Sequence, residues 1–291
     1  TDGSITSTVK ANPNRGFSIV TGTTPASGNF TFGHGLSTSP DMVIFKRRSN
    51  VSGWAVWHKD LSTDNDYLLL ESTAGNTTDS TVFNGAPSST VVNMGSAYSA
   101  SGAQTFVSYC FHSVSGYSKM GSYTGTGASG NTVTTGFKPA FVMCKRTDSA
   151  VSGDWVIYDN VRDVDDVANH YLLPNTSGAE GDYQNMTFDD TGFTLTSTAS
   201  LNQSGGTYIY MAFADTREAA FWLDDSGNNN DWENNGLTES DISLDSPTNN
   251  FATLNPLDKD ASCTLSEGNL KYSAVATGYR NVRSSAFVGT G

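Results

Sequence analysis

An acidic segment in the last third of the chain has the residue types that bind calcium. Residues 224–231 have the sequence DDSGNNND. Ca²⁺ takes about six to eight oxygen ligands, which carboxylates, amide side chains and loop carbonyls supply, and glycine allows the sharp bend of such a loop. The spacing is not that of an EF-hand, and a turn rich in Asp and Asn explains the same residues without a metal. The candidate calcium ligands are Asp224, Asp225, Asn228 and Asp231.

Three tryptophans are candidates for stacking on the rings of a sugar ligand. Trp54, Trp57 and Trp155 lie in short runs of apolar residues at related positions along the chain. An indole ring has a large apolar face, which suits either a sugar ring or the core of a β-sheet protein. Because the runs are strand-like, burial in a core is favoured, and the stacking role stays open.

Residues for acid–base or nucleophilic catalysis form no recognisable pattern. The chain has four histidines, and it lacks the Gly-x-Ser-x-Gly motif of serine hydrolases. No histidine occurs at corresponding positions in the two repeats described below. Adjacent aspartates such as Asp189 and Asp190 point to opposite faces of a strand, whereas glycoside hydrolysis needs two carboxylates across one sugar. The sequence therefore predicts a protein that is not an enzyme and has no cofactor apart from the candidate calcium ion.

The strongest pattern in the chain is an internal duplication with a period of about 100 residues. Five blocks of sequence recur in the same order. The corresponding segments are 16–18 and 116–118, 42–47 and 141–146, 52–57 and 152–158, 66–69 and 170–173, and 101–109 and 204–211. A unit of this length is the size of a small domain rather than of a solenoid repeat. We therefore expect two similar domains in tandem.

The apolar runs within each repeat predict β-strands. They are short, rich in Val, Ile, Tyr, Phe and Trp, and separated by turn residues. The runs that begin at Met42 and Phe106 are continuous, which predicts central strands covered on both faces. Residues 54–57 come closer to alternation, which predicts one face in solvent. Phe111 and Phe213 are expected at matching positions in the cores.

These observations predict an all-β fold with two tandem antiparallel β-sandwich repeats and the start of a third, different β module. The expected segments are a linker from a preceding domain at 1–15, repeats at 16–115 and 116–216, and an incomplete third module at 217–291. Since the sequence begins with Thr1 rather than Met, we expect it to be part of a longer polypeptide.

Charge and composition limit the partners of the chain. The formal net charge is −13, and clustered Lys and Arg, which phosphate binding requires, are few. No apolar run reaches the roughly 18–20 residues that span a bilayer. We therefore expect no nucleic-acid partner and no membrane insertion. The basic runs 46–48 and 145–146 recur at strand ends, where they are either solvated or clamp a carboxylate of the neighbouring module.

The motifs of the repeats resemble those of a known protein family. They are GHGL at 33–36, PDMVI at 40–44, KRR at 46–48, GFKPAFV at 136–142, WVIYD at 155–159 and SGGTYIYMAF at 204–213. This pattern resembles a domain repeated in large virion proteins of tailed bacteriophages, notably marine ones. The segments 225–228, 245–251 and 265–270 resemble the lead-in to a SPRY-like, concanavalin-type domain of the same proteins. The core that should follow Leu270 in that domain is not contained in this sequence.

The resemblance implies a structural virion component, such as a tail fibre or another appendage that acts in host-surface attachment. It implies an extracellular particle assembled in the host cytoplasm, other virion proteins and copies of the same chain as partners, and a host cell-surface glycan as a candidate ligand. Two alternatives stay open. One is an array of carbohydrate-binding modules with a true glycan pocket, and the other is a non-catalytic part of a polysaccharide-degrading enzyme.

Overall fold

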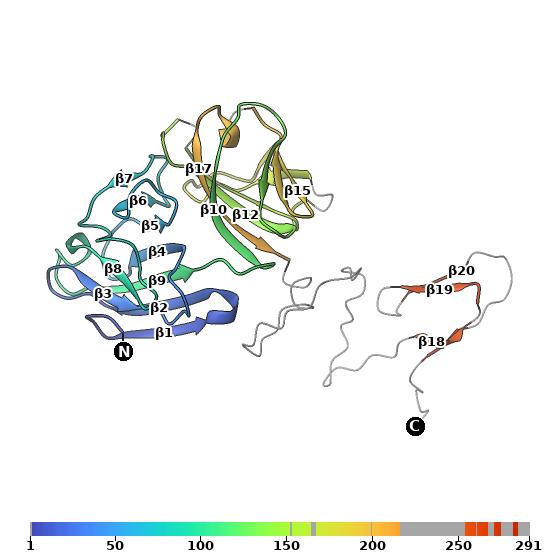
Figure 1. The fold of residues 1–291 in the computed structure, drawn as a ribbon, viewed down its shortest axis with the longest axis horizontal. Helices are drawn as coiled ribbons and strands as arrows, with labels where there is room; N and C mark the ends of the chain where they lie inside the picture. The colour runs from blue at the N-terminus through green and yellow to red at the C-terminus, as the bar shows by residue number, and fades with distance from the viewer. Residues whose placement is uncertain are drawn as a thin grey trace, which may run out of the picture. The chain divides into compact units, whose positions relative to one another are not determined.

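The protein was examined as a computed structural model, which describes residues 2–151, 153–163, 167–198, 200–215, 254–259, 261–266, 271–274 and 282–284. The chain divides into two compact units, Thr1–Asp215 and Thr216–Gly291. The strands of the described residues pair in antiparallel fashion, which confirms the predicted all-β fold (Figure 1). Within the described part of the chain, no helix is long and apolar enough to cross a membrane.

The first repeat consists of a large sheet covered on one face by a small one. The large sheet has the strand order β1-β2-β9-β4-β5-β6-β7, and the small sheet pairs β3 with β8. The strands are β1 (Ser7–Asn12), β2 (Phe17–Thr23), β3 (Phe30–Gly33), β4 (Met42–Arg47), β5 (Ala55–His58), β6 (Asp66–Leu69), β7 (Thr77–Thr78), β8 (Val91–Met94) and β9 (Thr105–Phe111). The segment 1–15 was expected to be a linker, but β1 within it pairs with β2 along its whole length and so belongs to this sheet.

The second repeat consists of two four-stranded sheets. The first has the order β10-β17-β12-β13 and the second has the order β11-β16-β15-β14. The strands are β10 (Ser118–Thr124), β11 (Asn131–Thr134), β12 (Pro139–Arg146), β13 (Trp155–Asp159), β14 (Val167–Tyr171), β15 (Gly181–Asp189), β16 (Gly192–Leu195) and β17 (Thr207–Ala214). We call β2-β9-β4-β5 and β10-β17-β12-β13 the main sheets of the two repeats.

The two main sheets have the same strand order and nearly the same register, as the duplication predicts. Met42 lies opposite Phe111 in the first repeat, and Phe141 lies opposite Phe213 in the second. The opening blocks, however, correspond with a shift of one residue, because Phe111 pairs with Phe17 whereas Phe213 pairs with Ser118. The likeness of the segments 16–18 and 116–118 therefore does not follow the structural register.

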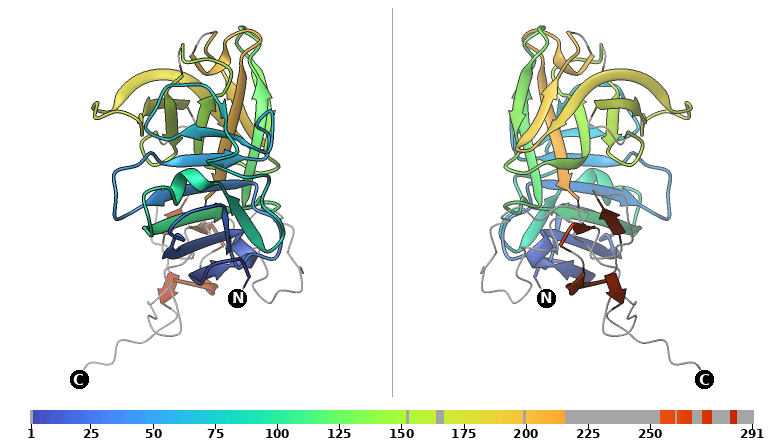
Figure 2. Two further views of the ribbon diagram at one scale, coloured as in Figure 1. Left: turned by 90° about the vertical axis from the view of Figure 1, so that its left-hand side faces the viewer. Right: turned by 90° about the vertical axis from the view of Figure 1, so that its right-hand side faces the viewer.

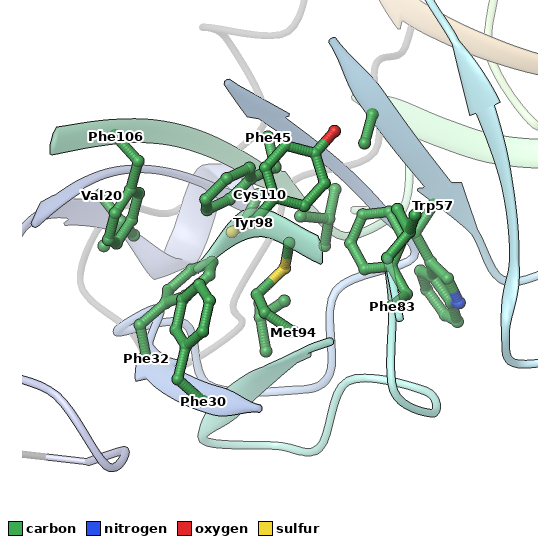
Figure 3. Close-up of a cluster of buried hydrophobic side chains, with 14 of the residues drawn as sticks. Val20, Phe30, Phe32, Phe45, Trp57, Phe83, Met94, Tyr98, Phe106 and Cys110 are labelled. Atoms are coloured by element: carbon green, nitrogen blue, oxygen red, sulfur yellow. The ribbon is translucent and has the colours of Figure 1, made fainter. Parts of the chain in front are cut away.

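Each repeat has its own apolar core between its two sheets. In the first repeat, Phe30 and Phe32 of the small sheet pack against Phe45 and Phe106 of the main sheet (Figure 3). The rings of Phe45 and Phe106 are stacked with their centroids 4.9 Å apart. The core of the second repeat is built in the same way from the inner faces of its two sheets and includes Tyr210. Aromatic rings supply much of the buried area in such small cores.

A third apolar cluster joins the two repeats through the outer faces of their main sheets. The backbones of the two repeats lie side by side in Figures 1 and 2. We call the cluster the inter-repeat core. Its buried members are Met42, Ile44, Val56, Leu61, Leu68, Met120, Met143, Trp155, Ile209 and Met211. Phe111 and Phe213 occupy the matching positions predicted for them and meet edge to face at 6.2 Å. The expectation that they lie in the cores of the repeats is wrong, because both are half-buried and pack against the inter-repeat core. The outer faces of the main sheets are therefore covered where they meet in this cluster.

The inter-repeat core explains the burial of two neighbouring strands. In β4, Val43 and Phe45 face the first repeat's own core, whereas Met42 and Ile44 face the inter-repeat core. The prediction that this run is covered on both faces is confirmed. The prediction of a solvent-exposed face on 54–57 is wrong for residues 55–57, which are buried in β5, whereas Trp54 is half-buried.

The described part of the second unit contains two strand pairs. β18 (Leu254–Lys259) pairs with β21 (Val282–Ser284), and β19 (Cys263–Ser266) pairs with β20 (Lys271–Ala274). These strands are consistent with the all-β fold class. The SPRY-like, concanavalin-type character expected for 217–291 stays a prediction.

Candidate functional site

The candidate calcium ligands Asp224, Asp225, Asn228 and Asp231 lie outside the described residues, so the calcium site stays a prediction. Within the residues that the structure describes, no group of three or more His, Cys, Asp or Glu side chains is arranged to hold a metal ion.

The three candidate stacking tryptophans occupy different environments. Trp57 is 3% exposed in the first repeat's core, where its Nε1 donates to the carbonyl of Asp64. Trp155 is 1% exposed in the inter-repeat core, where its Nε1 donates to the carbonyl of Leu69. Burial leaves neither indole face open to a ligand. Trp54 is half-buried and lines a surface groove, so it alone of the three is placed to touch a ligand.

We call the groove beside Trp54 the basic groove. It has a volume of about 790 Å³ and opens to solvent, and its lining residues all come from the first repeat. They are Thr21, Lys46, Arg47, Arg48, Ser49, Asn50, Val51, Trp54, Val107 and Tyr109. Three consecutive cations on a chain with 16 Lys and Arg residues and a net charge of −13 make this surface electrostatically unlike the average of the chain.

The floor of the groove is formed by residues that lie opposite one another on neighbouring strands. Val107 pairs with Thr21 on one side and with Lys46 on the other. Lys46 follows the pair of Phe45 and Ala55, so the residue opposite it is Trp54. Side chains on a strand alternate between faces, and Phe106 points into the first repeat's own core. The row of Thr21, Val107, Lys46 and Trp54 therefore lies on the outer face of the main sheet.

The cations of the groove point to different faces of the main sheet. Lys46 Nζ donates to the carbonyl of Ser52 and lies 5.5 Å from the centre of the Trp54 ring on the outer face. Arg47 pairs with Phe106 and lies over the ring of Tyr98, at 5.4 Å from its centroid, so its side chain points to the inner face. Its Nε and Nη1 are buried there without a hydrogen-bond partner, out of reach of a ligand in the groove.

The corresponding row of the second repeat is closed by the first repeat. Ile209 pairs with Lys145, and Lys145 pairs with Trp155, so these residues repeat the row of Val107, Lys46 and Trp54. All three are buried. A loop of the first repeat, residues 69–76, covers them and supplies backbone carbonyls.

Lys145 is the main polar contact between this loop and the second repeat. Its Nζ donates to the carbonyls of Thr73 at 3.2 Å and Ala74 at 2.8 Å, and to that of Arg146 at 2.6 Å. Burial lowers the pKa of Lys145 to about 8, an effect that the nearby carboxylates of Asp154 and Asp148 oppose. The basic run 145–146 thus does clamp the neighbouring repeat, but its acceptors there are carbonyls rather than a carboxylate.

A buried carboxylate holds the covering loop in shape. Asp66 accepts hydrogen bonds from the Thr63 hydroxyl at 2.7 Å, the Asn76 amide at 2.6 Å and the Thr78 hydroxyl at 2.5 Å. Burial alone would raise the pKa of Asp66, but these hydrogen bonds lower it below its ordinary value. The backbone N–H of Asn76 in turn donates to the carbonyl of Thr147 in the second repeat, at 2.7 Å.

Of the histidines, His58 is the one with the largest shift of pKa. It is 1% exposed, and its Nδ1 accepts a hydrogen bond from the backbone N–H of Asp60. Burial lowers the pKa of His58 to about 4, although Asp60 and Asp41 oppose the shift. The side chain is therefore neutral at physiological pH and has a structural position beside the second repeat rather than an exposed catalytic one.

Comparison with protein families bears on this two-repeat unit. Residues 1–217 match a domain family of unknown function, DUF7483. The chain belongs to this family. No curated protein and no solved structure matches it. The match covers both repeats together and ends close to Asp215, where the first compact unit ends. The DUF7483 domain thus corresponds to the pair of repeats and not to one of them.

Sequence reasoning identified the recurring basic runs but not the difference between them. The open groove contains Lys46 and Trp54, and the equivalent Lys145 and Trp155 lie under a loop. The two rows have the same residue types. They differ because the loop of the first repeat covers only the row of the second repeat. The residues of the two rows do not predict which row is covered.

Proposed function

We propose that this DUF7483 domain is a rigid, non-catalytic structural element of a tailed-bacteriophage appendage, such as a tail fibre, that acts in attachment to the host surface. The observation that carries the proposal is the inter-repeat core, which joins two β-sandwiches through the outer faces of their main sheets. The resemblance of the repeat motifs to virion proteins supplies the biological setting.

The joint between the repeats is suited to a structural role. Domains in one chain commonly meet through modest, polar interfaces and move relative to one another. Here the contact is apolar and is locked by hydrogen bonds from Trp155 and Lys145 to the loop 69–76. A pair joined in this way holds its two ends at a fixed distance and angle, as an extended appendage requires.

The surface chemistry supports the same role. A net charge of −13 keeps the chain soluble and repels other acidic particles. Copies of the chain in one appendage would multiply weak individual contacts with a host through effective concentration. Affinity would then come from the number of copies and their geometry rather than from one tight site.

The basic groove favours a second candidate function, a carbohydrate-binding module. It places Trp54 beside polar and cationic side chains on an open surface, an arrangement that suits a sugar. The two functions are compatible, since a structural module can also bind a glycan.

The proposal is tested by locating the chain on particles. Antibodies raised against the chain should label purified virions on an appendage by immunogold electron microscopy, and peptides of residues 1–215 should appear in the mass spectrum of the same particles. Absence of the chain from purified particles, with the chain present in infected cells, would overturn the proposal. Turnover of host polysaccharide by the purified chain would contradict its non-catalytic character.

A further inference from the structure

We propose that the basic groove binds an acidic saccharide, that is, a glycan with carboxylate or sulfate groups. The inference rests on the attachment function proposed above for its setting and deepens it by naming the site and the class of ligand. The observation that carries it is the contrast between two equivalent rows of residues, one covered by a loop and one open.

The covered row shows what such a row accepts. In the second repeat, Lys145 Nζ donates hydrogen bonds to the carbonyl oxygens of Thr73 and Ala74. The indole N–H of Trp155 donates to the carbonyl oxygen of Leu69. A series of acceptor oxygens therefore lies across a lysine and a tryptophan. In the first repeat, Lys46 and Trp54 form the same pair, and the groove over them is open.

The open row is more cationic than the covered one, because Arg48 lies at the position where the second repeat has Thr147. Lys46 and Arg48 are two residues apart at the end of β4, so they lie on the same outer face, and Arg48 is exposed at the groove. No carboxylate is among the lining residues, and the nearby Glu71 accepts a hydrogen bond from the backbone N–H of Trp54. Arginine binds carboxylate and sulfate oxygens in a bidentate fashion, so Arg48 beside Lys46 favours an anionic ligand.

The remaining lining favours a sugar as the carrier of the anion. The rings of Trp54 and Tyr109 offer apolar surface for the face of a pyranose, and Asn50 and Thr21 offer polar groups for hydroxyls. A long nucleic acid is disfavoured, because the net charge of −13 would repel it outside the groove. The groove therefore fits a short stretch of an acidic glycan.

The test is calorimetric titration of the purified chain with oligogalacturonate and with a sulfated oligosaccharide, against a neutral oligoglucan of the same length. We expect binding of an acidic ligand that weakens with salt, and none of the neutral one. The variant Arg48→Gln should bind about tenfold more weakly, because a charge-assisted contact is lost. Arg48 is exposed, so its melting temperature should stay unchanged. Lys119→Gln is the control of equal charge change, since Lys119 lines a different groove, to which both repeats contribute.

Several results would overturn the inference. One is the absence of binding of either acidic saccharide by a folded chain at millimolar ligand. Another is equal weakening in the Arg48→Gln and Lys119→Gln variants, which would mean that affinity follows net charge alone. Tighter binding of a Glu-rich peptide than of either saccharide would assign the groove to a protein partner. The titration uses purified chain and soluble ligand, so its failure is distinct from failure of the virion labelling that tests the proposed function.

Discussion

Replacing Trp155 by alanine tests whether the inter-repeat core stabilises the protein. Trp155 is 1% exposed, packs in the inter-repeat core and donates a hydrogen bond to the carbonyl of Leu69. Truncating a fully buried tryptophan removes its burial and leaves a cavity, which costs about 3–5 kcal/mol. That is a large part of the 5–15 kcal/mol that stabilises a typical domain.

The equivalent residue of the first repeat provides a matched control. Trp54 has the same strand position and packs against the inter-repeat core, but it is only half-buried and lines an open groove, where it contacts Lys46. Truncation there opens into solvent rather than leaving a closed cavity. We expect Trp54→Ala to cost roughly 1–2 kcal/mol, from partial loss of burial and of the cation–π contact.

Guanidinium denaturation followed by far-ultraviolet circular dichroism gives both free energies of unfolding without relying on tryptophan fluorescence. Trp155→Ala should lower the free energy by at least twice as much as Trp54→Ala. Equal losses in the two variants, or a loss below about 1 kcal/mol for Trp155→Ala, would refute the assignment of Trp155 to a shared core.

Two further predictions concern buried ionisable groups. Because the pKa of folded His58 lies near 4, below the 6.5 of an ordinary histidine, its contribution to stability is complete above pH 6.5 and is lost as the pH falls towards 4, by roughly 3 kcal/mol. Equilibrium unfolding from pH 7 to 4 should show this slope, and His58→Gln should flatten it; an unchanged slope would contradict the burial of a neutral histidine. Asp66→Asn keeps one acceptor oxygen but replaces the other by an NH2 group, which cannot accept from the Asn76 amide or the Thr63 backbone N–H, so we expect a loss of roughly 2–3 kcal/mol in thermal unfolding. The same variant should exchange amide hydrogen faster in the loop 69–76, whereas unaltered exchange there would show that Asp66 does not hold the loop.

The sequence was sufficient to predict the architecture of the main sheets because their strands are encoded locally. The continuous apolar run of β4 and the recurring block at 141–146 gave strand type, central position and correspondence together. The opening blocks misled by one residue, because Phe17 occupies the register position of Ser118 rather than that of Tyr117.

The contact between the repeats could not be predicted in the same way. Whether residues 54–57 face solvent depends on a second sheet about 100 residues further along the chain. The alternation of polar and apolar residues along a strand indicates how polar one of its faces is. Trp54 and His58 are amphipathic, however, and fit either a solvent-exposed face or a buried interface. For the same reason the sequence could not separate the open groove at Lys46 from the closed row at Lys145. Both rows carry the same basic residue at this position, and only the path of the loop 69–76 distinguishes the covered row from the open one.

The central claim, that the two repeats form one rigid unit, is tested most directly by hydrogen exchange of the whole chain in increasing denaturant. Peptides from β9 and β17, the central strands of the two main sheets, report the two repeats separately. We predict that both lose protection at the same denaturant concentration and that Trp155→Ala lowers this concentration equally for both. Loss of protection in two separate steps, with Trp155→Ala affecting the second repeat alone, would show that the repeats are independent domains.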